Sequence, residues 1–154
     1  MPLSPQWSYG LLQLVFQAAS ANTTNIAVNS TLGTNASLYL SLHTAQPTSN
    51  SQTTSEAVYG GYTRIPLVRG SSAGAFTATQ ATSAGATSSI SPTVTISFPQ
   101  ATSGAETETW FGVGLSSGSS VAGTMILSGS LSPTITVAAN VTPQLTTGTV
   151  ITIV

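Results

Sequence analysis

The chain has 154 residues, of which 40% are hydrophobic and 3% charged, and its formal net charge is −1 at pH 7. A typical soluble domain carries about 25% charged residues. With so little charge the sequence lacks the basic field that steers nucleic acid or anionic lipid toward a protein, so we expect no nucleic-acid or membrane-surface partner. The hydrophobic fraction is too high for a disordered chain, and the length suffices for one packed core.

The absence of cysteine rules out disulfides and thiolate metal sites. The sequence shows no basic segment ahead of an N-terminal apolar run and no stretch of about 18 apolar residues. We therefore expect cytoplasmic synthesis without export, and no membrane span. Few charges also mean little repulsion between copies, which favours a protein that packs among many copies or on a larger particle.

Residues 4–19 are predicted to form a short helix. Ser4 can cap its N-terminus, and Pro5 suits the first helical position. Apolar residues then recur at the spacing of an amphipathic face: Leu11, Leu12, Val15, Phe16 and Ala19. The helix either covers one end of a sheet sandwich or forms an arm that docks on a neighbouring subunit. We accordingly predict an N-terminal helix or arm at 1–20 and a single β-sandwich domain at 21–154.

The clearest strand lies between Ser37 and Pro47. Three leucines alternate there with polar or aromatic residues: Leu38, Leu40 and Leu42 against Tyr39, Ser41 and His43. This period of two predicts a half-buried strand that ends at a proline turn. The polar segment before it, residues 21–35, is predicted to be a loop or a short edge strand.

Two stretches of different character follow. Residues 59–69 begin with a glycine pair and continue as an extended run, in which Pro66 cannot donate a ladder hydrogen bond. This strand should therefore lie at a sheet edge or be broken at Pro66. Residues 70–92 are nearly all Gly, Ala, Ser and Thr around Phe76, and we predict a long surface loop.

The remainder of the chain has the pattern of several short strands. Apolar residues alternate with polar ones or glycines in 93–98 and 108–115, and a Ser-Gly-rich turn leads to a returning strand with Met125, Leu127 and Leu131. Further short strands around Ile135, Leu145 and Ile151 are separated by Pro133, Pro143 and Gly148. Short strands with regular turn signals indicate an all-β fold, an antiparallel β-sandwich of jelly-roll type with one short N-terminal helix.

The sequence offers no catalytic, cofactor or metal site. His43 is the single histidine, and neither cysteine nor aspartate is present to complete a metal site. Glu106 and Glu108 have the spacing of neighbours on one face of a strand, and we interpret them as the solvated start of that strand, not as an acid and base pair. No Gly-x-Ser-x-Gly elbow accompanies the many serines. We expect the protein not to be an enzyme and to use no cofactor.

Aromatic and basic residues are the candidates for contact with a partner. Five aromatic side chains could stack on sugars or lie in an interface, although aromatic residues more often pack in a core. These residues are Trp7, Trp110, Tyr39, Tyr59 and Tyr62. Arg64 and Arg69 are the two cations, read as a surface pair unless a neighbour buries them against glutamates or carbonyls.

Five motifs in a fixed order carry a family resemblance: Ser37 to Pro47, Tyr59 to Arg64, Ile96 to Ala101, Thr109 to Val113, and the tail from Ser128 to Val154. With these motifs in this order, the chain resembles a family of small virion proteins of tailed bacteriophages, whose members are often labelled tail-fibre-like. The chain departs from the family pattern at two places. Gly114 to Ser117 stands where acidic residues are common, and Gln46 stands where aspartate is usual.

The resemblance implies a β-rich structural component of the virion, assembled in the cytoplasm of the host bacterium. Our first hypothesis is a capsid decoration (cement) protein that binds the major capsid protein, assembles as a homotrimer and stabilises the outer shell. The second is a tail-tip or tail-fibre component that contacts the host surface. The candidate contact residues are the helix face and the edge strand: Leu11, Val15, Phe16, Arg64 and Arg69.

Overall fold

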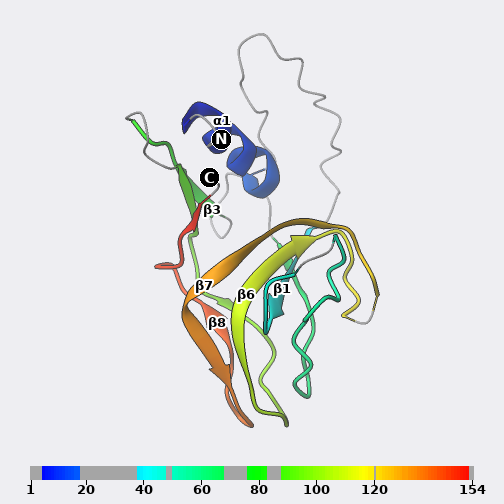
Figure 1. The fold of residues 1–154 in the computed structure, drawn as a ribbon. Coiled ribbons are helices and arrows are strands. Elements are labelled where there is room, and N and C mark those ends of the chain that lie inside the picture. The colour runs from blue at the N-terminus through cyan, green and yellow to red at the C-terminus, as the bar shows by residue number, and fades with distance from the viewer. Residues whose placement is uncertain are drawn as a thin grey trace. The chain divides into compact units, whose positions relative to one another are not determined.

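The fold is taken from a computed structural model that describes residues 5–17, 38–47, 50–67, 76–82, 88–119 and 121–152 (Figure 1). The chain divides into two compact units built from interleaved segments. Unit 1 comprises residues 1–36, 68–95 and 145–154, and unit 2 comprises residues 37–67 and 96–144.

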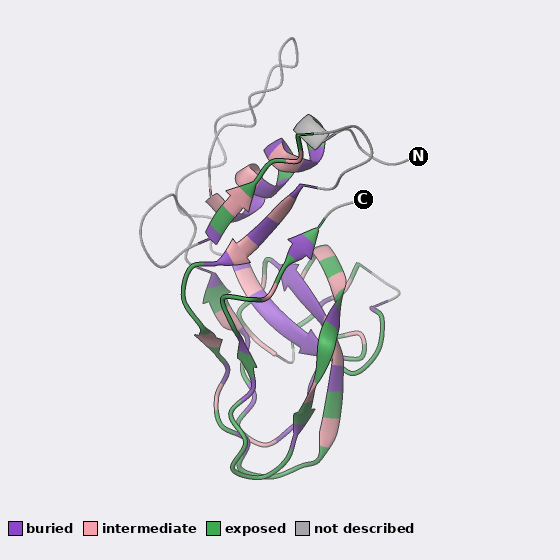
Figure 2. Cartoon of the chain, turned by 90° about the vertical axis from the view of Figure 1, so that its left-hand side faces the viewer, coloured by how far each residue is buried: buried purple, intermediate pink, exposed green. Residues whose placement is uncertain are grey.

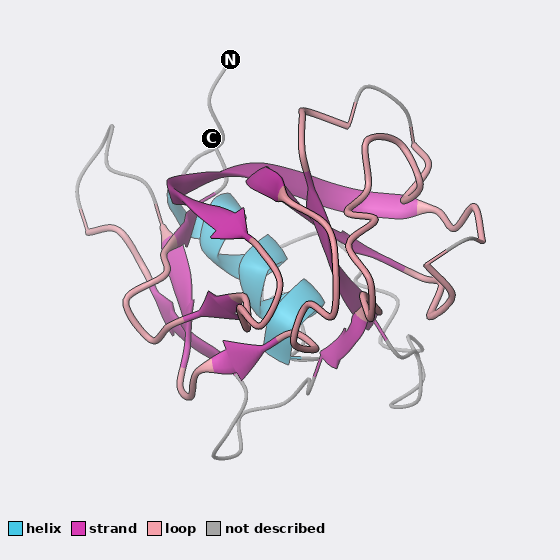
Figure 3. Ribbon diagram, turned by 90° about the horizontal axis from the view of Figure 1, so that it is seen from below, coloured by secondary structure: helices cyan, strands magenta, loops and turns pink. Residues whose placement is uncertain are grey.

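Unit 2 contains a four-stranded antiparallel sheet in the order β2-β1-β6-β7. Its strands are β1 (Leu38–His43), β2 (Ile65–Leu67), β6 (Glu106–Gly114) and β7 (Met125–Val137). β5 (Ile96–Ser97) pairs with β8 (Gln144–Leu145) in a separate two-stranded sheet, and the boundary between the units falls within β8. Loops join most of these strands (Figure 3).

The leucine side of β1 faces the core of unit 2, as the alternation predicts. Leu40 lies opposite Val113 and Leu42 opposite Phe111 on β6, and all four side chains are buried. The other side of β1 is buried as well, because Ser41 and His43 are fully covered. The prediction of a half-buried strand is therefore wrong for β1, since neighbouring segments pack on both of its faces (Figure 2).

Unit 1 combines the N-terminal helix with a three-stranded sheet in the order β3-β4-β9. Its helical part is α1 (Pro5–Leu12), continued by the π-helical segment η1 (Gln13–Gln17). The strands are β3 (Phe76–Thr79), β4 (Ser89–Pro92) and β9 (Ile151–Thr152). The ring of Phe16 packs on the ring of Phe76 with centroids 4.8 Å apart, and Gln17 Nε2 donates to the Phe76 carbonyl at 2.7 Å.

The predicted fold class is confirmed: the strands pair antiparallel, consistent with an all-β sandwich, and a short helix lies near the N-terminus. Pro66 lies in the edge strand β2, also as predicted. The prediction that residues 70–92 form a surface loop is wrong, because β3 and β4 lie within this range and Phe76 is buried. Small residues around a lone aromatic side chain gave no period-two signal there.

Two other predictions about strand length are corrected. Pro133 does not separate two strands but lies within the 13-residue β7, as an edge strand permits. The strand expected over residues 93–98 is reduced to β5, and Val94 is exposed. The predicted boundary at residue 20 and the segment 21–35 lie outside the described residues, so the division into 1–20 and 21–154 stays a prediction.

Candidate functional site

The most distinctive group of side chains in unit 2 is a buried ion pair between Glu56 and Arg64. Arg64 Nε lies 2.6 Å from Glu56 Oε1, and Arg64 Nη2 lies 2.7 Å from Glu56 Oε2, so the guanidinium binds the carboxylate through two parallel hydrogen bonds. Both side chains are almost completely removed from solvent. A buried pair of this kind is favourable only when its remaining polar atoms also have partners.

Tyr62 links the ion pair to the central sheet. Its hydroxyl donates to Glu56 Oε1 at 3.0 Å and accepts from the backbone N–H of Leu42 on β1 at 3.1 Å. Burial and the nearby Glu56 carboxylate raise the pKa of Tyr62 above its ordinary value, so the hydroxyl keeps its proton. The glycine pair before Tyr62 forms a tight turn, closed by a 3.0 Å bond from Tyr62 N to the Tyr59 carbonyl, in which Gly61 has a φ of 89°.

Arg64 also holds the connection between β6 and β7, described for residues 115–119 and 121–124 and here called the clamped loop. Arg64 Nη1 donates to the carbonyl of Ser116 at 3.0 Å and to that of Val121 at 3.2 Å. One buried guanidinium therefore joins the two ends of the loop. Leu115 N and Thr124 O close the base of the loop at 3.1 Å.

Gln52 provides a second support for the clamped loop. Its Oε1 accepts from Ser116 N at 2.9 Å, and its backbone N–H donates to Gly123 O at 3.0 Å. The fully buried side chain fills the space next to Gly114 and Gly123, where any larger residue would collide with it. The glycines are thus needed because Gln52 approaches the backbone closely.

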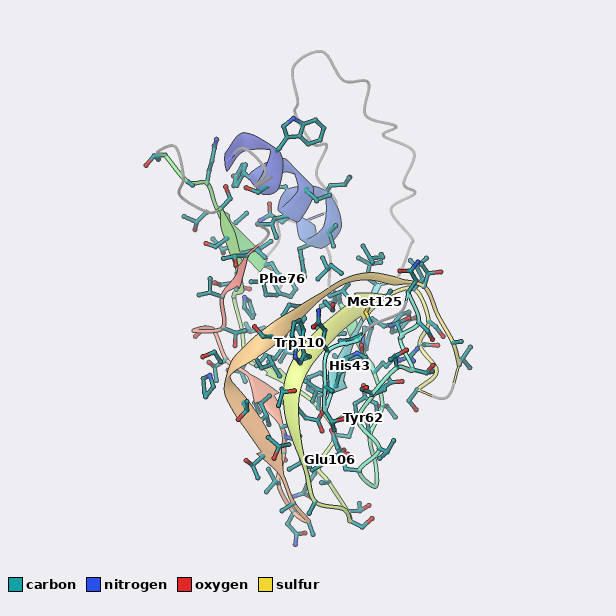
Figure 4. The ribbon with its side chains drawn as sticks, in the orientation of Figure 1. His43, Tyr62, Phe76, Glu106, Trp110 and Met125 are labelled. Carbon is teal, nitrogen blue, oxygen red and sulfur yellow. The ribbon has the colours of Figure 1, made fainter. Side chains whose placement is uncertain are left out.

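His43 lies fully buried on the other side of β1, near Met125 (Figure 4). Its Nδ1 donates to the Thr54 carbonyl at 2.9 Å, which leaves Nε2 to accept from the Ser41 hydroxyl at 2.8 Å. Burial lowers the pKa of His43 below its ordinary value. The neutral ring therefore acts as a structural link between β1 and the 50–57 segment.

Glu106 and Glu108 differ from the predicted solvated strand start. Glu106 Oε1 accepts from the backbone N–H groups of Val58 and Tyr59 at 3.0 and 2.8 Å. Glu108 is 0% exposed, no hydrogen bond to either of its carboxyl oxygens meets the usual geometric limits, and its side chain lies close to that of Glu106. Burial, together with the nearby Glu106 carboxylate, raises the pKa of Glu108 to about 8. The raised pKa favours the protonated, neutral form of Glu108 at pH 7.

The candidate contact residues occupy different environments. Leu11 is exposed on α1, whereas Val15 and Phe16 pack inside unit 1. Arg64 is the buried clamp described above, not a surface cation, and Arg69 lies outside the described residues. Contact of any of these residues with a partner stays a prediction.

Exposed apolar side chains instead gather near the clamped loop. Leu115 and Val121 in the loop are 52% and 55% exposed, and Ile126 at the start of β7 is 44% exposed. Within the described ranges, no group of three or more His, Cys, Asp or Glu side chains could hold a metal ion. None of the helices in the described part of the chain has the length and hydrophobicity to cross a membrane.

A sequence model of the family described as Podophage GP4 fiber I protein gp80 matches residues 15–152, from within η1 to the end of β9. The chain belongs to this fibre protein family. None of the curated proteins matches the chain. The resemblance to tailed-phage virion proteins is thereby confirmed, and this member of the fibre family is a structural component of the virion.

The residues that organise the site in this fibre family member were only partly visible in the sequence. Sequence reasoning singled out Arg64 but missed Glu56 and Gln52. One signal was available for Glu56, because a buried arginine needs a carboxylate or carbonyl partner and the chain has three acids. No local pattern identifies Gln52, whose role depends on glycines more than 60 residues away in sequence.

Proposed function

We propose that this chain is a tail-fibre component that contacts the surface of the host cell. The observation that carries the proposal is the clamped loop, an exposed connection whose two ends are fixed by one buried guanidinium in a chain of a fibre family. Ordering a loop on binding costs free energy, and a loop that is already held in place avoids much of that cost. Such a loop suits a contact that must form with an external surface.

The distribution of charge supports a contact without ionic steering. Glu56 and Arg64 neutralise each other, Glu108 is buried, and Glu106 accepts hydrogen bonds from two backbone amides. The described surface of unit 2 therefore presents almost no free charge. Recognition would rest on neutral hydrogen bonds and on the exposed aliphatic side chains of the clamped loop, and it would depend little on salt.

The alternative of a capsid decoration protein has less support. The family description names a fibre and not a shell protein. Binding to the capsid, a homotrimeric state and assembly in the host cytoplasm stay predictions. Copy number separates the two functions, because a shell component is needed once per few capsid subunits and a tail component only a few times per particle.

Quantitative mass spectrometry of purified particles tests the location. We expect on the order of one copy per hundred major capsid subunits, whereas about one copy per few subunits would overturn the tail proposal in favour of decoration. Purified chain should also slow the adsorption of phage to host cells, equally well at about 0.05 and about 0.5 M salt. Unchanged adsorption at saturating protein would contradict host contact.

The contribution of the clamped loop can be tested in the same competition assay. Leu115→Ser with Val121→Ser removes the exposed apolar side chains of the loop, and Val58→Ser is the matched control because Val58 is 83% exposed elsewhere. We expect the double variant to lose at least tenfold in competition while the control competes normally. Equal competition by both would show that the loop is not the contact.

A further inference from the structure

One face of the sheet in unit 2 changes from covered to open across three paired residues. His43 on β1 lies opposite Trp110 on β6, and Trp110 lies opposite Ser130 on β7. His43 is fully buried and bonded to the 50–57 segment, Trp110 is half-buried, and Ser130 is exposed. Trp110 therefore stands where the covered half of this face meets the open half (Figure 4).

Serine hydroxyls line the open half of this face. Ser130 lies directly opposite Trp110, and Ser128 is the next residue on the same face of β7. Gly129 between the serines belongs to the opposite face, because a Cβ there would collide with the ring of Phe111. Directly opposite residues have Cβ atoms about 5 Å apart. Trp110, Ser128 and Ser130 therefore form one continuous surface, here called the Trp110 strip.

The polar groups of the Trp110 strip have no partner in the described part of the chain. The indole N–H of Trp110 donates to no described residue, yet it is not among the buried side-chain atoms left without a partner, so it reaches solvent. The exposed hydroxyls of Ser128 and Ser130 form no hydrogen bond with described residues either. The strip thus offers an aromatic surface, one N–H donor and two hydroxyls that can donate or accept.

No free charge accompanies the strip among the described residues. The guanidinium of Arg64 is buried in its ion pair with Glu56. Glu106 accepts two backbone N–H groups, and Glu108 is buried. An acidic sugar or a phosphate would find no free cation to bind here. A ligand that matches this surface is neutral, with C–H groups for the indole and polar groups for the N–H and the hydroxyls.

We propose that the Trp110 strip binds a neutral saccharide. A pyranose ring presents C–H groups on one face, which pack on the electron-rich face of an indole, and hydroxyls around its edge, which bond to the indole N–H and the serine hydroxyls. An apolar protein surface would leave these polar groups unpaired, at a cost that a saccharide avoids. The biological role of the sugar rests on the proposed contact with the host cell, whose surface would carry it.

The fluorescence of Trp110 tests the proposal. The chain has two tryptophans, and Trp7→Phe at a position 42% exposed leaves Trp110 as the reporter. The probe is neutral polysaccharide released from host cells. Its control is the same material after periodate oxidation, which opens sugar rings that carry adjacent hydroxyls. We expect the intact polysaccharide to change Trp110 emission saturably and the oxidised material to leave it unchanged.

Two pairs of substitutions on β7 locate the binding. Ser128→Ala with Ser130→Ala removes both hydroxyls of the strip, and we expect binding to weaken roughly tenfold. Thr134→Ala with Thr136→Ala removes two exposed hydroxyls from the same strand outside the strip, and this matched control should bind normally. Trp110 emission that does not respond to the polysaccharide would overturn the proposal, as would equal binding by both pairs.

The same measurements separate this inference from the proposed function. A chain that binds the polysaccharide through the Trp110 strip but does not slow phage adsorption supports the saccharide site and contradicts host contact. A chain that slows adsorption while Trp110 emission stays unchanged supports host contact and overturns the saccharide site. The partner on the host would then be a protein.

Discussion

The two units of the chain are stabilised by different kinds of interaction. In unit 1 the described helix and sheet meet through apolar and aromatic contacts, with Phe16 against Phe76. In unit 2 the apolar sheet core is accompanied by buried polar side chains, and all four described charged residues lie there. Unit 1 should therefore be sensitive to lost volume, and unit 2 to a lost charge or hydrogen bond. This difference can be tested one unit at a time.

The largest effect is expected from Arg64→Met. The variant leaves Glu56 buried without its cation and releases both ends of the clamped loop. Breaking a buried pair by removing one partner costs about 4 kcal/mol of unfolding free energy. Urea denaturation should show this loss, and hydrogen exchange should show faster exchange in residues 115–119 and 121–124.

The control for this prediction removes both charges. Glu56→Gln combined with Arg64→Met leaves no unpaired buried charge, so a substantial part of the lost stability should return while the loop stays released. If the double variant is as unstable as Arg64→Met, the cost comes from the lost loop contacts and not from the stranded carboxylate. A single variant of unchanged stability would show that the ion pair does not stabilise unit 2.

Phe76→Ala is the corresponding test for unit 1. Removing a buried aromatic ring costs about 3 kcal/mol through lost burial and the cavity left behind. Because the ring packs on Phe16, we expect faster hydrogen exchange in η1, β3 and β4 and unchanged exchange in β1 and β6. Thr77→Ala, at the exposed neighbouring position on β3, should change neither unit. Equal loosening of both units would contradict the contrast between them.

The sequence predicts unit 2 better than unit 1 for a physical reason. Large apolar residues recur at every second position in β1 and β6. This pattern predicts strands because it places the apolar side chains on one face of a sheet. β3 and β4 consist mostly of Ser, Thr and Ala, whose small side chains carry little periodic signal, so they were predicted as a loop. Only the packing of Phe76 and Ile90 reveals that this stretch is part of a core.

The candidate site shows where sequence reasoning ends. The sequence singled out Arg64 as a candidate contact residue, and its contact with a partner stays a prediction. Its actual neighbours, the Glu56 carboxylate and the carbonyls of Ser116 and Val121, are brought to it only by the fold. Glu108 was expected in solvent because a carboxylate near a Gly-Ala turn usually lies there. In the fold Glu108 is buried on β6, where it pairs with Ile135 of β7, and Glu106 on the same strand accepts the backbone amides of Val58 and Tyr59.

Glu108 gives the smallest of these predicted effects and ties unit 2 to pH. Its pKa is raised from 4.5 to about 8 in the folded chain, so the folded state holds the proton more tightly than the unfolded state. The unfolding free energy should therefore fall as the pH rises from 4.5 to 8 and stay level above that. From pH 6 to pH 8 the loss from this group is about 2 kcal/mol.

Glu108→Gln removes the titrating group while keeping its shape and an uncharged polar end, so this part of the pH dependence should vanish from urea denaturation curves. Glu106→Gln is the control on the same strand, and it should lower the pKa of Glu108 by removing a nearby negative charge without abolishing the slope. The buried, neutral His43 titrates in the opposite sense, because its lowered pKa makes the fold less stable as the pH falls below 6.5. If the unfolding free energy changes from pH 6 to pH 8 in the same way with and without Glu108, the carboxyl of Glu108 reaches water in the folded chain. The sensitivity of unit 2 to charge would then come from the ion pair alone.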